Sequence, residues 1–166
     1  MSHDQQLRAD RLVFYEKEIE ELNAELDAFL ELSKAKTAML IDREGHLVTR
    51  RGESIKSSLD SVSALIAGSF AATREMARLM GEDEFAVLHH QGVSNSIQIQ
   101  AVGPRTLMGV IFDGRTNLGL VRFYAQECNR RVKEILEAVE VESAGRGSGL
   151  DESFSASAEA ALDKLF

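Results

Sequence analysis

Residues 57–81, SSLDSVSALIAGSFAATREMARLMG, are the stretch around which the rest of the chain can be organised. Ser57 with Asp60 three residues later matches the start of a capping box, and the acidic side chain suits the positive end of a helix dipole. Gly81 is a natural stop, because only glycine enters the left-handed conformation after a helix without steric cost. No proline interrupts the stretch, so it predicts one long central helix.

This predicted helix has two faces when each residue turns it by about 100°. One broad apolar side is expected to lie on a sheet, and its members are Val62, Leu65, Ile66, Ser69, Ala72, Met76, Leu79 and Met80. A second stripe begins with small residues and ends with charges: Ala64, Gly68, Ala71, Glu75 and Arg78. Small residues let another backbone come close, although Gly68 costs roughly 1 kcal/mol of helix propensity relative to alanine. The stripe indicates a close contact, either within the chain or with another molecule.

Composition limits the class of protein. The chain has 166 residues, enough for one domain and a tail, and 44% of them are hydrophobic. A formal net charge of −8 argues against duplex nucleic acid and anionic membrane surfaces as partners. A single cysteine excludes an intrachain disulfide and a cysteine-based metal cluster. No apolar run approaches the roughly 20 residues of a membrane-spanning helix, and the polar N-terminus is unlike a signal peptide. We therefore expect a cytoplasmic protein without membrane insertion.

The segments around the central helix predict a further helix and five short strands. A long amphipathic helix is expected over about residues 4–33, because apolar residues recur there at steps of three and four. Short apolar or alternating runs predict strands at 38–42, 46–49, 84–90, 95–102 and 106–113. Since tight turns join most of them, we expect a mostly antiparallel sheet. The predicted fold is α/β in the α+β sense, a three-layer α/β/α sandwich around a five-stranded sheet.

The strand at 95–102 has a regular alternation of side chains. Ile97, Ile99 and Ala101 alternate with Gln98 and Gln100. Such a pattern is typical of a strand with one buried and one solvent-facing side, so we expect the two glutamines to face water.

The chain after residue 113 predicts a second long helix, a linker and a short helix. Apolar residues recur from Leu118 to Val139, and Cys128 lies among them as an inert buried thiol. Residues 142–152, which begin ESAGRGSG, predict a flexible linker. Residues 153–166 predict an amphipathic helix that is detached from the domain of residues 1–141.

Motifs for catalysis, phosphate binding or metal binding are absent from the sequence. It contains no GxxxxGK[ST] loop, no GxGxxG and no GxSxG. His89 and His90 are neighbours on a strand, so they point to opposite faces and make poor joint metal ligands. Arg115 and Arg122 flank the start of the last long helix, as surface cations or as contacts to a partner's phosphate. The sequence predicts a binding module, with no enzymatic activity, metal or cofactor.

Together these residues resemble the roadblock/dynein light chain family, and most closely its MglB-type members. Four segments carry the likeness: LVFYEKEIEELN at 12–23, MLIDREGHLV at 39–48, AGSFAATREMARLMGEDEF at 67–85 and VIFDGRTNLGLVR at 110–122. The resemblance extends over about residues 12–139, and the C-terminal ALDKLF is also similar.

The resemblance implies a homodimer with its central helices side by side and its sheets joined. MglB-type dimers bind a GTP-loaded Ras-like GTPase of the MglA type and stimulate its GTP hydrolysis, in cell polarity or motility. The resemblance implies that they insert no arginine finger and instead reposition the GTPase's own catalytic residues. This implies a cytoplasmic regulator concentrated at a cell pole through its partners. Two alternatives stay open: a scaffold dimer that tethers partners without changing GTP turnover, and a small-molecule sensor with a cavity.

The resemblance and the small-residue stripe together imply where a GTPase binds. The expected surface consists of Ala64, Ala67, Gly68, Ala71, Ala72, Glu75 and Arg78. Arg74 and Glu75 depart from the small residues that MglB-type sequences can have there, which changes the charge of this surface. The family's C-terminal helix makes a second GTPase contact tied to nucleotide exchange, and its apolar end corresponds to Leu162, Leu165 and Phe166.

Overall fold

The computed structural model describes residue 14 and residues 16–164, except for the side chains of residues 146–155. Its elements are α2 (Glu16–Ser33), β1 (Thr37–Asp42), β2 (Leu47–Gly52), α3 (Leu59–Leu79), β3 (Val87–Gln91), β4 (Asn95–Val102), β5 (Thr106–Asp113) and α4 (Leu118–Asp163). The helix predicted over about 4–33 is observed from Glu16 onward, and its earlier part lies outside the described residues.

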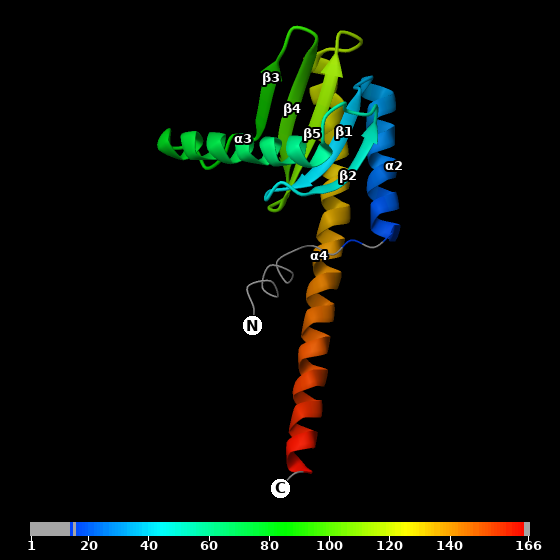
Figure 1. The fold of residues 1–166 in the computed structure, drawn as a ribbon, viewed down its shortest axis with the longest axis vertical. Coiled ribbons are helices and arrows are strands. Elements are labelled where there is room, and N and C mark those ends of the chain that lie inside the picture. The colour runs from blue at the N-terminus through cyan, green and yellow to red at the C-terminus, as the bar shows by residue number, and fades with distance from the viewer. Residues whose placement is uncertain (1–13, 15, 165–166) are drawn as a thin grey trace.

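The strands form one five-stranded sheet in the order β2-β1-β5-β4-β3, and every neighbouring pair is antiparallel. Figure 1 shows α3 crossing one face of this sheet, while α2 and α4 lie together on the other face. The C-terminal end of α3 projects past the sheet, and α4 extends far below it. The predicted antiparallel sheet and three-layer α+β sandwich are confirmed.

The two faces of the sheet carry separate hydrophobic cores, as the two-residue period of a strand requires. Under α2 and α4, apolar side chains from β1, β4 and β5 meet both helices; the central members are Leu26, Phe29, Leu40, Val110, Val121 and Val132. Under α3, the buried set is smaller and consists of Met39, Ile41, Ile66, Ala67, Phe70, Ile99 and Leu107. The larger core holds the domain together, and the smaller one positions α3.

A glycine in β5 allows α3 to lie close to the sheet. A Cβ atom at Gly109 would stand 3.2 Å from Met39 Cγ and 3.3 Å from Ile66 Cδ1. Because these distances are tighter than ordinary carbon contacts, a larger residue at this position would push Ile66, and with it α3, outward. The missing side chain therefore determines the height of α3 above the sheet.

The glutamines of β4 are buried, so the prediction that they face water is wrong. Gln98 and Gln100 are only 1% and 5% exposed, because α4 covers this part of the sheet. Gln100 Nε2 donates a hydrogen bond to the backbone carbonyl of Ala125 in α4 at 3.2 Å. Gln98 Nε2 donates to Gln100 Oε1, also at 3.2 Å. These bonds give both amide nitrogens partners in place of the hydrogen bonds to water that burial removes, while Gln98 Oε1 has no partner among the described residues.

The prediction of a flexible linker at residues 142–152 is wrong, because these residues belong to the last helix. α4 continues without interruption from Leu118 to Asp163, through the segment in which a flexible linker was predicted. Glycine lowers helix propensity by about 1 kcal/mol per residue but does not forbid a helix, and the segment contains no proline. The packing does change near the predicted boundary, since Val139 is the last residue of α4 that is buried among those with described side chains.

The described part of the chain contains no helix that is both long and apolar enough to cross a membrane.

Candidate partner-binding surface on α3

The ends of α3 follow from local side-chain chemistry. The N-cap is Ser58, one residue later than predicted, and its Oγ accepts a hydrogen bond from the backbone N–H of Ser61 at 3.4 Å. Asp60 lies in the first turn, where a negative charge suits the helix dipole. Gly81 follows the helix with φ of +83°, the left-handed conformation that was predicted for it.

The side of α3 that lies on the sheet was predicted wrongly: the helix is rotated about its axis relative to the prediction. The buried residues are Ser63, Ile66, Ala67, Phe70 and Ala77. Leu65, Met76, Leu79 and Met80, which were expected to lie on the sheet, are between 52% and 83% exposed. The reason is physical: the apolar stripe is wider than the contact with the sheet, and the second half of the helix projects past the strands (Figure 1).

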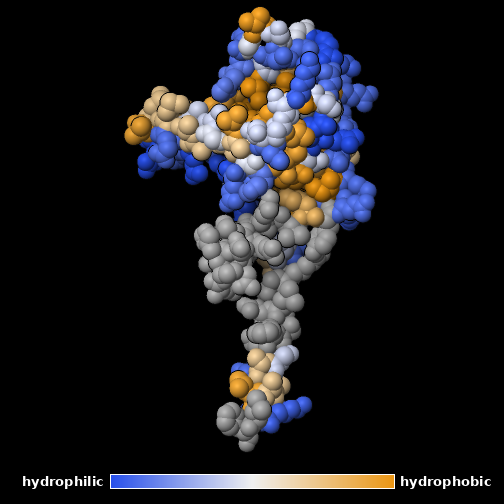
Figure 2. Space-filling view, viewed as in Figure 1, coloured by the Kyte–Doolittle hydropathy of each residue, from blue (hydrophilic) through white to orange (hydrophobic). Residues whose placement is uncertain are grey.

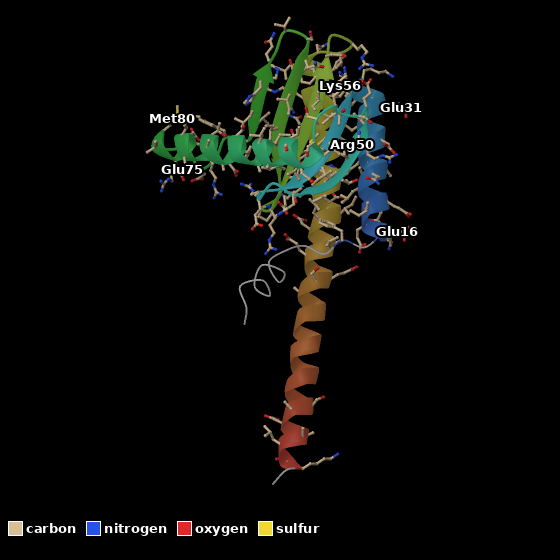
Figure 3. The ribbon with its side chains drawn as sticks, viewed as in Figure 1. Glu16, Glu31, Arg50, Lys56, Glu75 and Met80 are labelled. Carbon is tan, nitrogen blue, oxygen red and sulfur yellow. The ribbon has the colours of Figure 1, made fainter. Side chains whose placement is uncertain are left out.

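As a result, α3 presents two chemically different exposed flanks. We call the first the apolar flank; at helical spacing it consists of Leu65, Ala72, Met76 and Leu79, with Met80 at its end. Figure 2 shows hydrophobic side chains along the upper side of the projecting part of α3 and hydrophilic ones along its lower side. In Figure 3, Met80 and Glu75 mark these two sides.

The second flank, the small-residue stripe, contains Ala64, Gly68, Ala71, Glu75 and Arg78, and all five are exposed. A Cβ atom at Gly68 would meet no other atom within 4 Å. No neighbouring element of the described chain therefore explains the lack of a side chain at this position. The structure leaves a flat, open surface at the middle of the stripe.

Ala64 differs from the rest of the stripe. The turn between β1 and β2 lies against it, and a Cβ atom at Gly45 would stand 2.8 Å from Ala64 Cα. Its small size thus serves a contact within the chain. Ala67 is only 4% exposed and faces the sheet, whereas Ala72 lies on the apolar flank. The predicted GTPase-binding residues are therefore distributed over three sides of one helix.

A pocket of about 510 Å³ lies beside the stripe, between α3, the start of β5 and the β1–β2 turn. Ala67, Phe70 and Ala71 line it from the helix, and Leu107 lines it from β5. Arg43, from the turn, stacks over the Phe70 ring at 5.4 Å and donates a hydrogen bond to Glu84 at 2.7 Å. Sequence reasoning missed Arg43, because nothing in the sequence brings it near Glu84, 41 positions away.

The other residues considered for chemistry have structural roles. Arg115 is held by Asp113 at 3.0 Å and Glu53 at 2.7 Å, and these hydrogen bonds raise its pKa. Burial raises the pKa of the Cys128 thiol to about 12, which agrees with an unreactive core residue. His89 stacks on Phe112 at 5.9 Å between ring centres. Within the described residues, no three His, Cys, Asp or Glu side chains are grouped to hold a metal ion.

The predicted second contact lies at the end of α4. Leu162 is exposed there, whereas Leu165 and Phe166 lie outside the described residues.

An antiparallel sheet of this order, with α3 on one face and the α2–α4 pair on the other, defines a roadblock-type sandwich. The chain belongs to the Roadblock/LC7 domain family, whose model matches residues 22–112. The resemblance noted in the sequence is thereby confirmed. No protein with a curated description matches the chain significantly.

Solved MglB structures are similar over most of their length. Myxococcus xanthus MglB is 36% identical, with a TM-score of 0.72, over 77% of this chain and 96% of that chain. The gliding protein MglB from Thermus thermophilus is 29% identical, with a TM-score of 0.73, over 76% and 96%. An MglB described with a tetrameric arrangement is 28% identical, with a TM-score of 0.74, over 77% and 96%.

Proposed function

We propose that the protein is a homodimeric regulator that binds a GTP-loaded, MglA-type Ras-like GTPase and stimulates its GTP hydrolysis. The observation that carries the proposal is the open small-residue stripe of α3, centred on Gly68. Flat helical surfaces of this kind permit close backbone approach, and no described part of the chain occupies this one. The likeness to MglB supports the choice of partner. The regulator would act in cell polarity or motility, in the cytoplasm and concentrated at a cell pole through its partners.

The apolar flank supports the homodimer. Leu65, Met76 and Leu79 are each more than half exposed, and burying one large apolar side chain stabilises an interface by about 1.5–3 kcal/mol. A second copy of α3 laid along this flank would remove these side chains from water. The small-residue stripe, on another side of the same helix, would stay open for the GTPase.

Two of the exposed arginines are held by carboxylates of the chain, which does not favour either of them as a group inserted into the GTPase's active site. Arg115 is tied to Asp113 and Glu53, and Arg78 pairs with Glu75 at 2.8 Å. We propose that stimulation works by repositioning the GTPase's own catalytic groups, as the likeness to MglB suggests. Leu162 at the end of α4 belongs to the proposed second contact, together with Leu165 and Phe166.

The test is single-turnover hydrolysis by the MglA-type GTPase of the same organism, preloaded with GTP, with and without excess of this protein. We expect an acceleration of at least about tenfold, below the 10³–10⁵ that an inserted arginine supplies. Ala71→Arg should abolish binding and acceleration, because it places a long charged side chain on the stripe. Ala138→Arg, at an exposed position of α4, is the matched control and should keep both.

Each other outcome has a defined meaning. Binding without acceleration would replace the activating role with a scaffold. Binding that survives Ala71→Arg, in a variant of unchanged dimer mass and melting temperature, would remove α3 as the contact surface. A wild-type protein that neither binds nor accelerates the GTPase would contradict the proposal as a whole.

A further inference from the structure

The pocket beside the small-residue stripe has an apolar wall and a charged rim. Phe70, Ala71 and Leu107 contribute to the wall, and three guanidinium groups and three carboxylates surround it. Its volume of about 510 Å³ falls in the range of pockets that hold ligands or side chains of a partner. This lining suits a group with an apolar stem and a polar end.

The three arginines of the rim differ in their hydrogen bonding. Arg43 donates to Glu84 at 2.7 Å, and Arg78 donates to Glu75 at 2.8 Å. Arg74 has no hydrogen bond or ion pair with any other residue in the described part of the chain. Arg78, one turn along the helix, carries the same charge and cannot neutralise it. Arg74 is therefore the cation of this rim that is available to an outside acceptor.

A second donor beside the pocket also lacks a partner. Arg43 Nε is buried and has no hydrogen-bond acceptor among the described residues. A buried donor without an acceptor costs about 1–3 kcal/mol. This nitrogen is closed to solvent, and Nη1 of the same group donates to Glu84. An acceptor brought in by a partner would therefore reach the guanidinium group of Arg74 and not the Nε of Arg43.

The rim also limits how much negative charge the pocket accepts. Glu75, Glu82 and Asp83 line it together with the arginines. A phosphate chain with several negative charges would be repelled by these carboxylates, whereas a single carboxylate can pair with Arg74. The methylene groups of the side chain that bears this carboxylate can then lie on Phe70 and Ala71. An ion pair inside the pocket is screened less by salt than one on the open surface.

We propose that this pocket receives an acidic side chain, a glutamate or aspartate, of the bound GTPase, and that Arg74 is the specificity-determining residue that pairs with it. The inference rests on the proposed function, since it concerns the same partner. It adds a directional contact beside the flat middle of the stripe at Gly68. The pairing selects among GTPases by whether they carry a carboxylate at the matching position.

The test compares Arg74→Glu with Lys133→Glu, which makes the same charge change at an exposed position of α4, on the other face of the sheet. Dissociation constants are measured with the GTP-loaded MglA-type GTPase at 0.05 M and 0.5 M salt. We expect Arg74→Glu to weaken binding at least tenfold at low salt, and Lys133→Glu to weaken it less than threefold. Arg74→Lys should retain most of the affinity, because it retains the charge.

Reversal of charge on the partner completes the test. One Glu→Arg or Asp→Arg variant of the GTPase should restore binding to Arg74→Glu while weakening binding to the wild type, as a double-mutant cycle requires. Equal losses in Arg74→Glu and Lys133→Glu, or no restoring variant among the acidic surface residues, overturns the inference. A wild-type protein that binds no GTPase overturns the proposed function as well, whereas wild-type binding with an unaffected Arg74→Glu overturns this inference alone.

Discussion

Replacing Gly68 with alanine is expected to stabilise the fold and to weaken the binding of the partner. Gly68 lies in the interior of α3, nearly midway between Leu59 and Leu79. Glycine there is less favourable than alanine by about 0.8–1.0 kcal/mol. An added Cβ atom would meet nothing within 4 Å, so no steric cost within the chain reduces this gain.

The gain can be converted into a melting temperature. For a protein of 150–250 residues, 1 kcal/mol corresponds to a shift of about 2–4 °C, and the chain has 166 residues. We therefore expect Gly68→Ala to melt about 2–4 °C above the wild type in a calorimetric scan. Binding of the GTP-loaded GTPase should become weaker by about fivefold or more, because an extra methyl group in a close contact costs about 1–3 kcal/mol.

The control is Gly114→Ala, in the turn before α4, where an added Cβ atom also meets nothing within 4 Å. This variant should leave GTPase binding unchanged. Gly68→Ala could instead lower the melting temperature and shift the measured mass from that of a dimer to that of a monomer. This result would mean that a second copy of the chain covers Gly68. Higher stability with full binding would mean that the glycine lies outside the interface, and the argument from the open stripe would fail.

Three further experiments test the fold itself. Gly45→Ala should lower the free energy of unfolding by about 1–3 kcal/mol in a urea titration, because Gly45 has φ of +98° and its added Cβ atom would stand 2.8 Å from Ala64 Cα; a change below about 0.5 kcal/mol would contradict this. Cys128 should react with a thiol reagent at pH 8 only after unfolding, since burial raises its pKa to about 12. By the same linkage, stability should fall as the pH rises from about 8.5, the pKa of an unfolded cysteine, toward 12, and rapid labelling of the native protein would refute both statements. Gln100→Ala should cost about 1–3 kcal/mol in a thermal melt, because the Gln98 amide loses its acceptor; an unchanged melting temperature would show that water replaces the bond.

The order of elements was predictable because short-range physics determines it. Turn residues and strand alternation located all five strands within a few residues, and Gly81 ended α3 as expected. The loop predicted at 142–152 failed because glycine and serine lower helix propensity without excluding a helix. Glycine content thus distinguishes a weak helix from a loop only when proline or tertiary packing adds evidence.

The helix that carries the candidate site was predictable, but its rotation on the sheet was not. The sequence identified α3 and its small residues, yet the rotation of the helix on the sheet depends on Phe70 and on the gap above Gly109. Arg43 entered the site through the fold alone, since its partner Glu84 is distant in sequence. An apolar stripe on a helix indicates that its side chains will be buried. Only the packed structure shows whether other parts of the same chain bury them.

The buried glutamines of β4 also determine how this strand is aligned with its neighbour. If β4 slipped by one residue along β5, Gln98 and Gln100 would face α3, and the isoleucines of β4 would face α4. The alternation of apolar and polar residues in β4 disfavours this register. A slip by two residues would preserve that alternation. It would also put Ser96 or Val102 in the place of one glutamine and break a hydrogen bond to the other glutamine or to Ala125. Two amides two residues apart thus give the sheet a single alignment that hydrophobic packing alone would leave ambiguous.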